Sequence, residues 1–236
     1  MSALLSLCLL ASPALAGDGA GTSVAPIFRL GPGARPAALA DSYVAIAEGA
    51  DAAAWNPAGL AFLEGPSASL MYLRLFEQVH YNYVGFGMPW RERFGFGGHV
   101  VYSKTNAVPR TFEDPGGNFD PARSGGSFSN SDLKLGLSGA YKVLPWLSAG
   151  AGAAFFRDTV DASSVNGMLF DLAGLARPRG RFRYGLALQN LGGNRGGTAP
   201  SIARVGAAFD WSPKGLVSAE LQRPFDTSSP AFSLGT

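Results

Sequence analysis

The chain has 236 residues, of which 19 are basic and 17 acidic, and its formal net charge is +2. Only 15% of the residues are charged, against about 25% in an average soluble domain. A hydrophobic content of 47% argues against disorder, and the near balance of charge argues against nucleic-acid binding. Composition alone does not separate a soluble all-β domain from a β-barrel that faces lipid.

The amino terminus has the features of a secretory signal peptide. Residues Ser2–Leu15 form an apolar run that ends in Ala14-Leu15-Ala16, an A-x-A cleavage site. Pro13 keeps the run shorter than the roughly 20 residues of a spanning helix. We predict a cleaved signal peptide over residues 1–16, with a short buried helix as the alternative. Cleavage removes Cys8, the single cysteine, so the mature chain could form no disulfide.

Residues 17–66 are rich in Ala, Gly and Pro, whereas from Ser67 onward segments of about ten residues alternate apolar with small or polar side chains. Such strands are long for a globular protein and suit a membrane crossing. A half-buried sandwich strand would also alternate, so alternation alone leaves both readings open. The predicted strands are Ser67–Phe76, Val79–Met88, Phe94–Lys104, Asp132–Val143, Leu147–Arg157, Gly167–Leu175, Phe182–Leu191, Ile202–Trp211 and Gly215–Gln222, with a tenth beginning at Ala231.

The connections between these strands alternate in length after the first hairpin. Membrane barrels have short turns on the periplasmic side and longer loops outside, whereas a sandwich has no reason to sort its loops in this way. The predicted short turns are Pro89–Arg93, Leu144–Trp146, Ala176–Arg181 and Ser212–Lys214; the predicted longer loops are Thr105–Ser131, Asp158–Asn166, Gly192–Ser201 and Arg223–Pro230.

Aromatic residues gather at the short turns. Amphipathic rings favour the headgroup zone and form girdles in membrane barrels. We predict that the membrane-interface aromatics are Trp90, Tyr141, Trp146 and Trp211. The sequence therefore predicts an all-β transmembrane antiparallel β-barrel in the bacterial outer membrane, in contact with outer-membrane lipid.

Three motifs precede the first strand: Gly-Ala-Arg within Arg29–Pro36, Tyr-Val-Ala at Tyr43–Ala45, and Trp-Asn-Pro-Ala-Gly-Leu at Trp55–Leu60. In this order they resemble the amino-terminal signature of the PorV/PorQ family, which is similar to the FadL-type transporters. The residues that carry this match are Gly33, Ala34, Arg35, Tyr43, Trp55, Asn56, Pro57 and Gly59. Family members commonly carry Met-Gly shortly before Tyr-Val-Ala, where this chain has Leu39-Ala40.

The resemblance implies a FadL-like barrel with residues 17–66 folded inside as a hatch. Asn56-Pro57 is typical of a turn, and Gly59 permits a positive φ. Trp55–Gly59 is interpreted as a turn that docks the hatch, with a direct part in gating or ligand contact as the alternative.

Nine full strands and a tenth short one are too few for the fourteen that the resemblance implies. Membrane barrels are closed and mostly even-numbered, so we expect residues 67–236 to be an incomplete barrel, truncated at the carboxy terminus. A ten-strand barrel that lacks half of its last strand is the alternative.

The sequence contains no recognisable catalytic motif. His80 and His99 lack ligand spacing, and neither G-x-S-x-G nor a P-loop is present. We expect no enzymatic activity, no cofactor and no metal site.

Three functions are consistent with these features. The first is export across the outer membrane, as in protein secretion or surface assembly, with secreted proteins bound by the outer loops. The second is a FadL-like channel for hydrophobic small molecules such as fatty acids. The third is a structural barrel without cargo. For the second function the candidate pocket-lining residues are Phe62, Met71, Leu73 and Phe86.

Overall fold

A computed structural model describes residues 25–75, 78–121, 125–178, 180–194, 197–213, 215–226 and 230–236. The predicted signal peptide and the start of the predicted hatch lie outside these ranges, as does Phe76. Among the described residues, no helix combines the length and the apolar character that crossing a membrane requires.

All ten predicted strands are present, and most extend further than the alternation indicated. Nearest neighbours pair antiparallel in one sheet of order β1-β2-β3-β6-β7-β8-β9-β11-β12-β13. The pairings of the described residues do not join β13 to β1. The long strands are β1 (Ser67–Leu75), β2 (Val79–Trp90), β3 (Phe94–Thr105), β6 (Asn130–Leu144), β7 (Leu147–Val160), β8 (Ser163–Ala176), β9 (Phe182–Asn194), β11 (Ile202–Ser212), β12 (Gly215–Pro224) and β13 (Ala231–Gly235).

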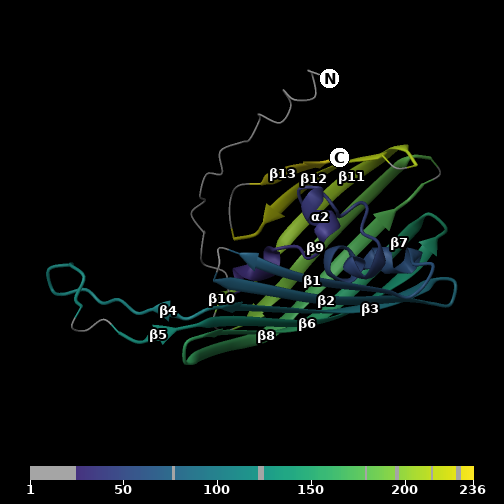
Figure 1. The fold of residues 1–236 in the computed structure, drawn as a ribbon. Coiled ribbons are helices and arrows are strands. Elements are labelled where there is room, and N and C mark those ends of the chain that lie inside the picture. Colours follow the sequence, from purple (N-terminus) through teal and green to yellow (C-terminus); the bar gives the residue numbers. More distant parts are fainter. Residues whose placement is uncertain are drawn as a thin grey trace, which may run out of the picture.

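The strands curve around the amino-terminal segment, as Figure 1 shows. We call residues 25–66 the hatch, and its elements occupy the concave side of the sheet. They are short: η2 (Pro26–Arg29), α2 (Ala34–Ala38), η3 (Gly49–Asp51), α3 (Ala52–Trp55) and η4 (Pro57–Phe62). Most of the buried hydrophobic residues belong to the hatch or to the strand faces against it.

The two faces of each strand have opposite character, as the alternation predicted. In β6, Leu135 and Leu137 are exposed on the convex face, whereas Asp132, Lys134 and Ser138 are buried on the concave face. Leu137 is 77% exposed at the middle of its strand. A soluble sandwich buries its apolar face, so this arrangement excludes the sandwich reading.

One predicted loop is wrong. Asp158–Asn166 was expected to be a longer outer loop, but β7 continues to Val160 and β8 begins at Ser163. Register pairs such as Arg157↔Asn166 and Thr159↔Ser164 extend the hairpin. The residues of the extension are mostly polar, so the apolar alternation ends where the strands continue.

The longest connection, between β3 and β6, contains its own small hairpin. Strands β4 (Val108–Pro109) and β5 (Ser127–Phe128) pair antiparallel and project from one end of the sheet (Figure 1). An ion pair between Arg110 and Asp161 fastens the base of this hairpin to the β7–β8 turn. We call this end of the sheet the long-loop end, and the opposite end the short-turn end.

Candidate functional site

A buried ion pair holds the backbone of the hatch. It lies on the concave face of the curved sheet, which we call the wall. Arg204 on β11 donates to Glu220 on β12 at 2.9 Å, and both side chains are almost fully buried. The second oxygen of Glu220 accepts the backbone N–H groups of Tyr43 and Val44, each at 2.8 Å. A buried charge is tolerated when it is paired and its remaining sites are hydrogen-bonded, and here the hatch supplies the missing partners.

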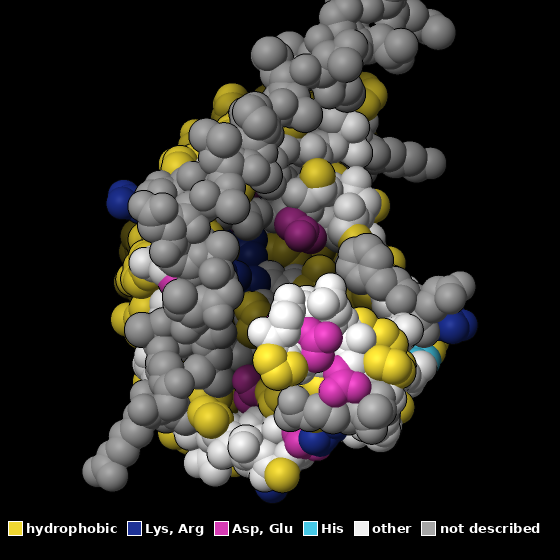
Figure 2. All heavy atoms as spheres, turned by 90° about the vertical axis from the view of Figure 1, so that its left-hand side faces the viewer, with side chains coloured by type: hydrophobic (Ala, Val, Ile, Leu, Met, Phe, Trp, Pro, Cys, Tyr) yellow, Lys and Arg dark blue, Asp and Glu magenta, His cyan; other side chains and the backbone are white. Residues whose placement is uncertain are grey.

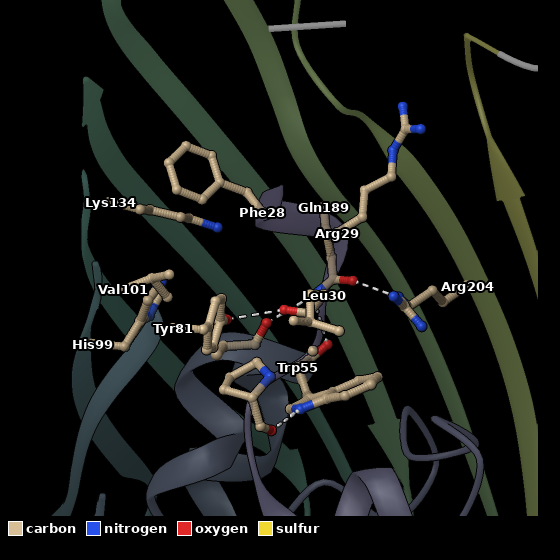
Figure 3. Close-up of a pocket in the computed structure, with 13 residues that line it drawn as sticks. Phe28, Arg29, Leu30, Trp55, Tyr81, His99, Val101, Lys134, Gln189 and Arg204 are labelled. Carbon is tan, nitrogen blue, oxygen red and sulfur yellow. Dashed lines mark hydrogen bonds between the residues drawn. The ribbon is translucent and has the colours of Figure 1, made fainter. Parts of the chain in front are cut away.

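The same arginine reaches a second part of the hatch. Its Nε donates to Gln189 Oε1 on β9 at 2.7 Å. Gln189 Nε2 in turn donates to the backbone carbonyls of Ala54 and Trp55, at 2.7 and 3.0 Å. The guanidinium lies 4.8 Å from the centre of the Trp55 ring, a cation–π contact. Figure 3 shows Arg204, Gln189 and Trp55 together on the inner side of the wall.

The Trp-Asn-Pro motif forms the turn that was predicted. Asn56 Oδ1 accepts the backbone N–H of Ala58 at 3.1 Å, so Asn56 caps η4, which begins at Pro57. The Asn56 amide also donates to the carbonyls of Val44 on the hatch and Gly174 on β8, at 2.8 and 3.1 Å. Trp55 Nε1 donates to the carbonyl of Pro32 at 2.7 Å. This geometry agrees with a turn that packs the hatch against the wall, and the alternative of a part in gating or ligand contact stays a prediction.

The other motif residues shape the hatch itself. Gly33 has a φ of 111° and precedes α2, which contains Ala34 and Arg35. Arg35 forms an ion pair with Glu48 at the start of η3. Tyr43 packs edge-on against Trp55, with ring centres 5.7 Å apart. Burial raises the pKa of Tyr43 to about 12, although the nearby Arg35 partly offsets this effect.

Glycines on both partners allow backbones to approach closely. A Cβ on Gly59 would lie 2.4 Å from the Ala47 carbonyl oxygen within the hatch. On the wall, a Cβ on Gly95, Gly150 or Gly185 would lie between 2.0 and 2.3 Å from a hatch backbone atom. Such distances are impossible for a real Cβ, so the small inner faces of the strands are the complement of the hatch.

The hatch turns through two residues of unusual backbone conformation directly after α2. Ala40 has a φ of 51° and Asp41 a φ of 62°, both in the left-handed region that glycine adopts most readily. An alanine in this region is less favourable than a glycine, so the turn at Ala40 costs some backbone strain.

On the long-loop side of the hatch lies a small cavity. Its lining includes Phe28, Tyr81, His99, Lys134 and Arg204 (Figure 3). Lys134 donates to Asn190 Oδ1 at 2.6 Å, and Tyr81 donates to the Leu30 carbonyl at 3.0 Å. The cavity measures about 20 Å³, which is room for about one water molecule. Viewed from the long-loop end, the molecule is hollowed, with basic and acidic side chains inside (Figure 2).

A larger hollow lies between the hatch and β1. It measures about 510 Å³ and is lined by small or apolar residues, among them Leu30, Ala37, Met71 and Leu73. The hatch is tied to this wall by the Gly33 N–H, which donates to the Met71 sulfur at 3.1 Å. Two of the four predicted pocket residues, Met71 and Leu73, therefore lie beside one hollow.

The other two predicted pocket residues lie elsewhere. Phe86 is on the convex face of β2 and 46% exposed, so its assignment to an interior pocket is wrong. Its neighbours along the strand, Gly85 and Gly87, are buried on the concave face, so Phe86 faces the other side. Phe62 ends η4 at the short-turn end, where Arg177 and Lys142 lie over its ring. Aromatic character alone did not show which face of a strand a ring would occupy.

The predicted interface aromatics all lie at the short-turn end with exposed side chains: Trp90, Tyr141, Trp146 and Trp211. Phe94 links two of them, because its ring centre lies 6.0 Å from that of Trp90 and 4.9 Å from that of Tyr141.

The sequence reading missed the residues that hold the hatch. The alternation places Arg204 and Glu220 on the polar faces of their strands, but it does not show which groups they meet. The usable signal was the charged residues on the inner faces of two consecutive strands, Arg204 and Asp210 on β11 and Glu220 on β12. Among the described residues, no group of three or more His, Cys, Asp and Glu side chains could hold a metal ion.

Comparison with known proteins places the fold. No protein-family model matches the chain, and no curated protein matches its sequence. Among solved structures, the crystal structure of a FadL homologue from Pseudomonas aeruginosa superposes with a TM-score of 0.53 at 13% sequence identity. The match covers 80% of this chain and 67% of that chain. The chain therefore has the FadL-like antiparallel β-barrel fold.

Proposed function

We propose that this protein is a non-enzymatic β-barrel of the bacterial outer membrane, of PorV/PorQ type, which acts in export across that membrane. The convex face supports the membrane location, because many large apolar side chains are exposed on it. A girdle of four aromatic residues at one end fits the headgroup zone. The FadL-like fold agrees with this location.

The observation that carries the proposal is the way the hatch fills the concave side. Side chains from β6, β7, β9 and β12 donate to or accept from its backbone, through Ser138, Ser148, Gln189 and Glu220. Arg204 on β11 donates to two of these side chains, Gln189 and Glu220. A lumen occupied in this way suits a protein whose working surface is its outer loops. The longest of these loops, between β3 and β6, carries the hairpin of β4 and β5.

The location is tested by fractionation of cells that express the natural gene. We expect the protein in the outer-membrane fraction, extracted only by detergent, with a gel mobility that changes on heating. Recovery as a freely soluble protein would contradict the membrane location and with it the proposed function.

The export role is tested by shortening the hairpin. Replacing residues 108–128 with a Gly-Ser linker removes β4 and β5 but leaves β3 and β6 paired. We expect this variant to reach the membrane and to lose co-purification of secreted proteins. The matched control inserts the same Gly-Ser linker into the β11–β12 turn at the opposite end, and it should keep those partners. Equal recovery of partners with both variants would contradict a role for the hairpin.

A second candidate function is uptake of hydrophobic small molecules. The hollow beside Met71 and Leu73 favours it, because it is mostly apolar and large enough for part of an acyl chain. Extraction of the purified protein followed by mass spectrometry would detect bound lipid. Met71→Trp should fill the hollow and lower the recovered lipid, whereas Met88→Trp on the convex face should not. Absence of bound lipid from the unmodified protein would remove this candidate.

A further inference from the structure

The short-turn end carries more positive charge than its ion pairs neutralise. Glu48 and Asp210 pair with Arg35 and Arg183. Glu92 is an acidic residue at these turns, but among the described residues no carboxylate forms an ion pair with the arginines of the turns. These arginines, which we call the rim arginines, are Arg91, Arg93, Arg177 and Arg181.

Each rim arginine lies beside a girdle aromatic. Arg91 lies over the Trp90 ring, with its guanidinium carbon 5.2 Å from the ring centre. Arg93 donates to the Tyr141 hydroxyl at 3.4 Å.

The remaining two rim arginines make backbone contacts with the girdle. Arg181 donates to the carbonyl of Trp211 at 3.2 Å, and the backbone N–H of Arg177 donates to the carbonyl of Trp146 at 2.7 Å. The guanidinium groups of Arg91, Arg93 and Arg181 therefore share one level with the girdle rings, whereas that of Arg177 lies over the Phe62 ring of the hatch.

Two grooves open at this level. One, of about 540 Å³, is lined by Pro145, Trp146, Arg177 and Pro178. The other, of about 360 Å³, includes Arg181 and Arg183 in its lining.

The guanidinium at the first groove is incompletely partnered. Arg177 donates to the Ala47 carbonyl at 3.3 Å, but its buried Nε has no hydrogen-bond partner among the described residues. Burial and the neighbouring Arg183 lower the pKa of Arg177 to about 10. An anion in the groove would stabilise this cation.

The opposite end has no such excess. Its acidic residues include Glu113, Asp114, Asp158 and Asp161, which offset the basic residues of the same region. The asymmetry therefore belongs to one rim and not to the chain as a whole, whose net charge is only +2.

We propose that the rim arginines bind the phosphate headgroups of anionic phospholipids, and that Trp146 and Arg177 form the most defined headgroup site. The proposal rests on the membrane location given under the proposed function. A lipid fits better than an acidic protein because the cations lie among the girdle aromatics, directly beside the exposed apolar convex face. Guanidinium groups are well suited to phosphate oxygens because they donate in a fixed, bidentate geometry.

The chain supplies its own probe for this rim. Three of its four tryptophans are Trp90, Trp146 and Trp211, and the fourth, Trp55, is buried in the hatch. Tryptophan fluorescence quenched by brominated lipid therefore reports mainly on lipid at the short-turn end. The protein would be reconstituted in phosphatidylcholine vesicles that contain a minor fraction of brominated phosphatidylglycerol or, as the reference, of brominated phosphatidylcholine.

We expect stronger quenching by brominated phosphatidylglycerol than by the same fraction of brominated phosphatidylcholine, with a difference that shrinks in high salt. The variant R91Q/R93Q/R181Q removes three exposed cations without touching the hatch. Its preference should fall by about fivefold for each arginine removed. R177K keeps the charge of the groove but loses the guanidinium, and it should weaken the preference less than R177Q.

The matched control K104Q/R157Q/R223Q removes three exposed cations from the long-loop end and should keep the preference. Equal quenching by both lipids, or an unchanged preference in R91Q/R93Q/R181Q, would overturn the headgroup proposal while leaving the membrane location intact. Failure of the unmodified protein to insert into pure phosphatidylcholine would instead contradict the proposed function.

Discussion

The two faces of the strands behave as two different kinds of surface. On the convex face, large apolar side chains such as Leu137 and Val205 make few contacts within the chain. On the concave face, single polar groups reach particular atoms of the hatch, as Glu220 reaches the N–H groups of Tyr43 and Val44. A face that meets lipid needs only to be apolar, whereas a face that meets an irregular backbone must place each donor and acceptor.

This contrast also explains how the hatch is stable with so little regular structure. Its helices have only three to six residues, so many of its backbone groups lack partners within the hatch. An unpaired backbone group away from water is costly. Wall side chains such as Gln189 and Ser148 supply partners that a longer helix would have supplied internally.

The largest expected effect comes from breaking the buried ion pair. Glu220→Ala leaves Arg204 charged and buried, and it removes the acceptor of two hatch N–H groups. We expect a loss of about 3–5 kcal/mol in the free energy of unfolding, measured by denaturant unfolding in detergent, with faster proteolysis of the hatch.

The matched control is Asp161→Ala, which removes the exposed partner of Arg110 and should cost about 0–1 kcal/mol. Similar losses in the two variants would mean that the buried pair does not hold the hatch.

The convex face is tested by charge. Leu137→Arg places a cation at the middle of β6 on the side that we expect to meet lipid, and it should cost about 2–4 kcal/mol in a bilayer. Leu137→Phe keeps the side chain apolar and should change little. If the arginine is tolerated as well as the phenylalanine in lipid vesicles, the convex face does not meet hydrocarbon.

The burial of Tyr43 predicts a dependence on alkaline pH. Its pKa is about 12 in the folded chain and about 10 when exposed. Between these values the unfolded chain releases the proton and the folded chain keeps it, so stability falls as the pH rises from 10 to 12. The loss attributable to Tyr43 is about 2–3 kcal/mol. Tyr43→Phe should reduce the fall of the free energy of unfolding with pH across this range. A pH dependence equal to that of the unmodified protein would contradict the prediction.

The close approach of the wall and hatch backbones is tested by two glycine-to-alanine variants, one on the concave face and one on the convex face. Gly185→Ala places a Cβ 2.2 Å from the Val44 carbonyl oxygen, and we expect a cost of about 1–3 kcal/mol. Gly174→Ala places a Cβ on the outer side of β8 with its nearest neighbour 3.9 Å away. Only the first variant should lower the midpoint of denaturant unfolding.

The smallest expected effect is a gain. Ala40→Gly relieves a φ of 51°, although glycine also increases the entropy of the unfolded chain. We expect a net stabilisation of less than about 1 kcal/mol, best measured as a shift of the thermal midpoint. Ala37→Gly, within α2, should be destabilising instead, and a loss in both variants would argue against strain at Ala40.

Much of the fold could be predicted because it depends on local alternation. The strand starts at Ser67, Val79, Phe94 and Phe182 match the structure, and the polar side of β6 faces inward as expected. The extension of β7 and β8 beyond their apolar part was missed. Outside the membrane both faces of a strand meet water, so the residues there need not alternate between apolar and polar. Phe86 was assigned to the wrong face. Gly85 and Gly87 lie on the concave side, which small residues fit, but the sequence does not show which side of the sheet is concave.

The sequence by itself determined which residues form strands, where the short turns and their aromatic girdle lie, and that Trp55-Asn56-Pro57 forms a turn. These features depend on neighbours along the chain, so they can be read from spacing. Tertiary structure alone decided that Glu220, Arg204 and Gln189 meet the hatch, and that Gly185 leaves room for Val44. Those contacts join positions more than 130 residues apart, and they exist only once the sheet has curved around the hatch.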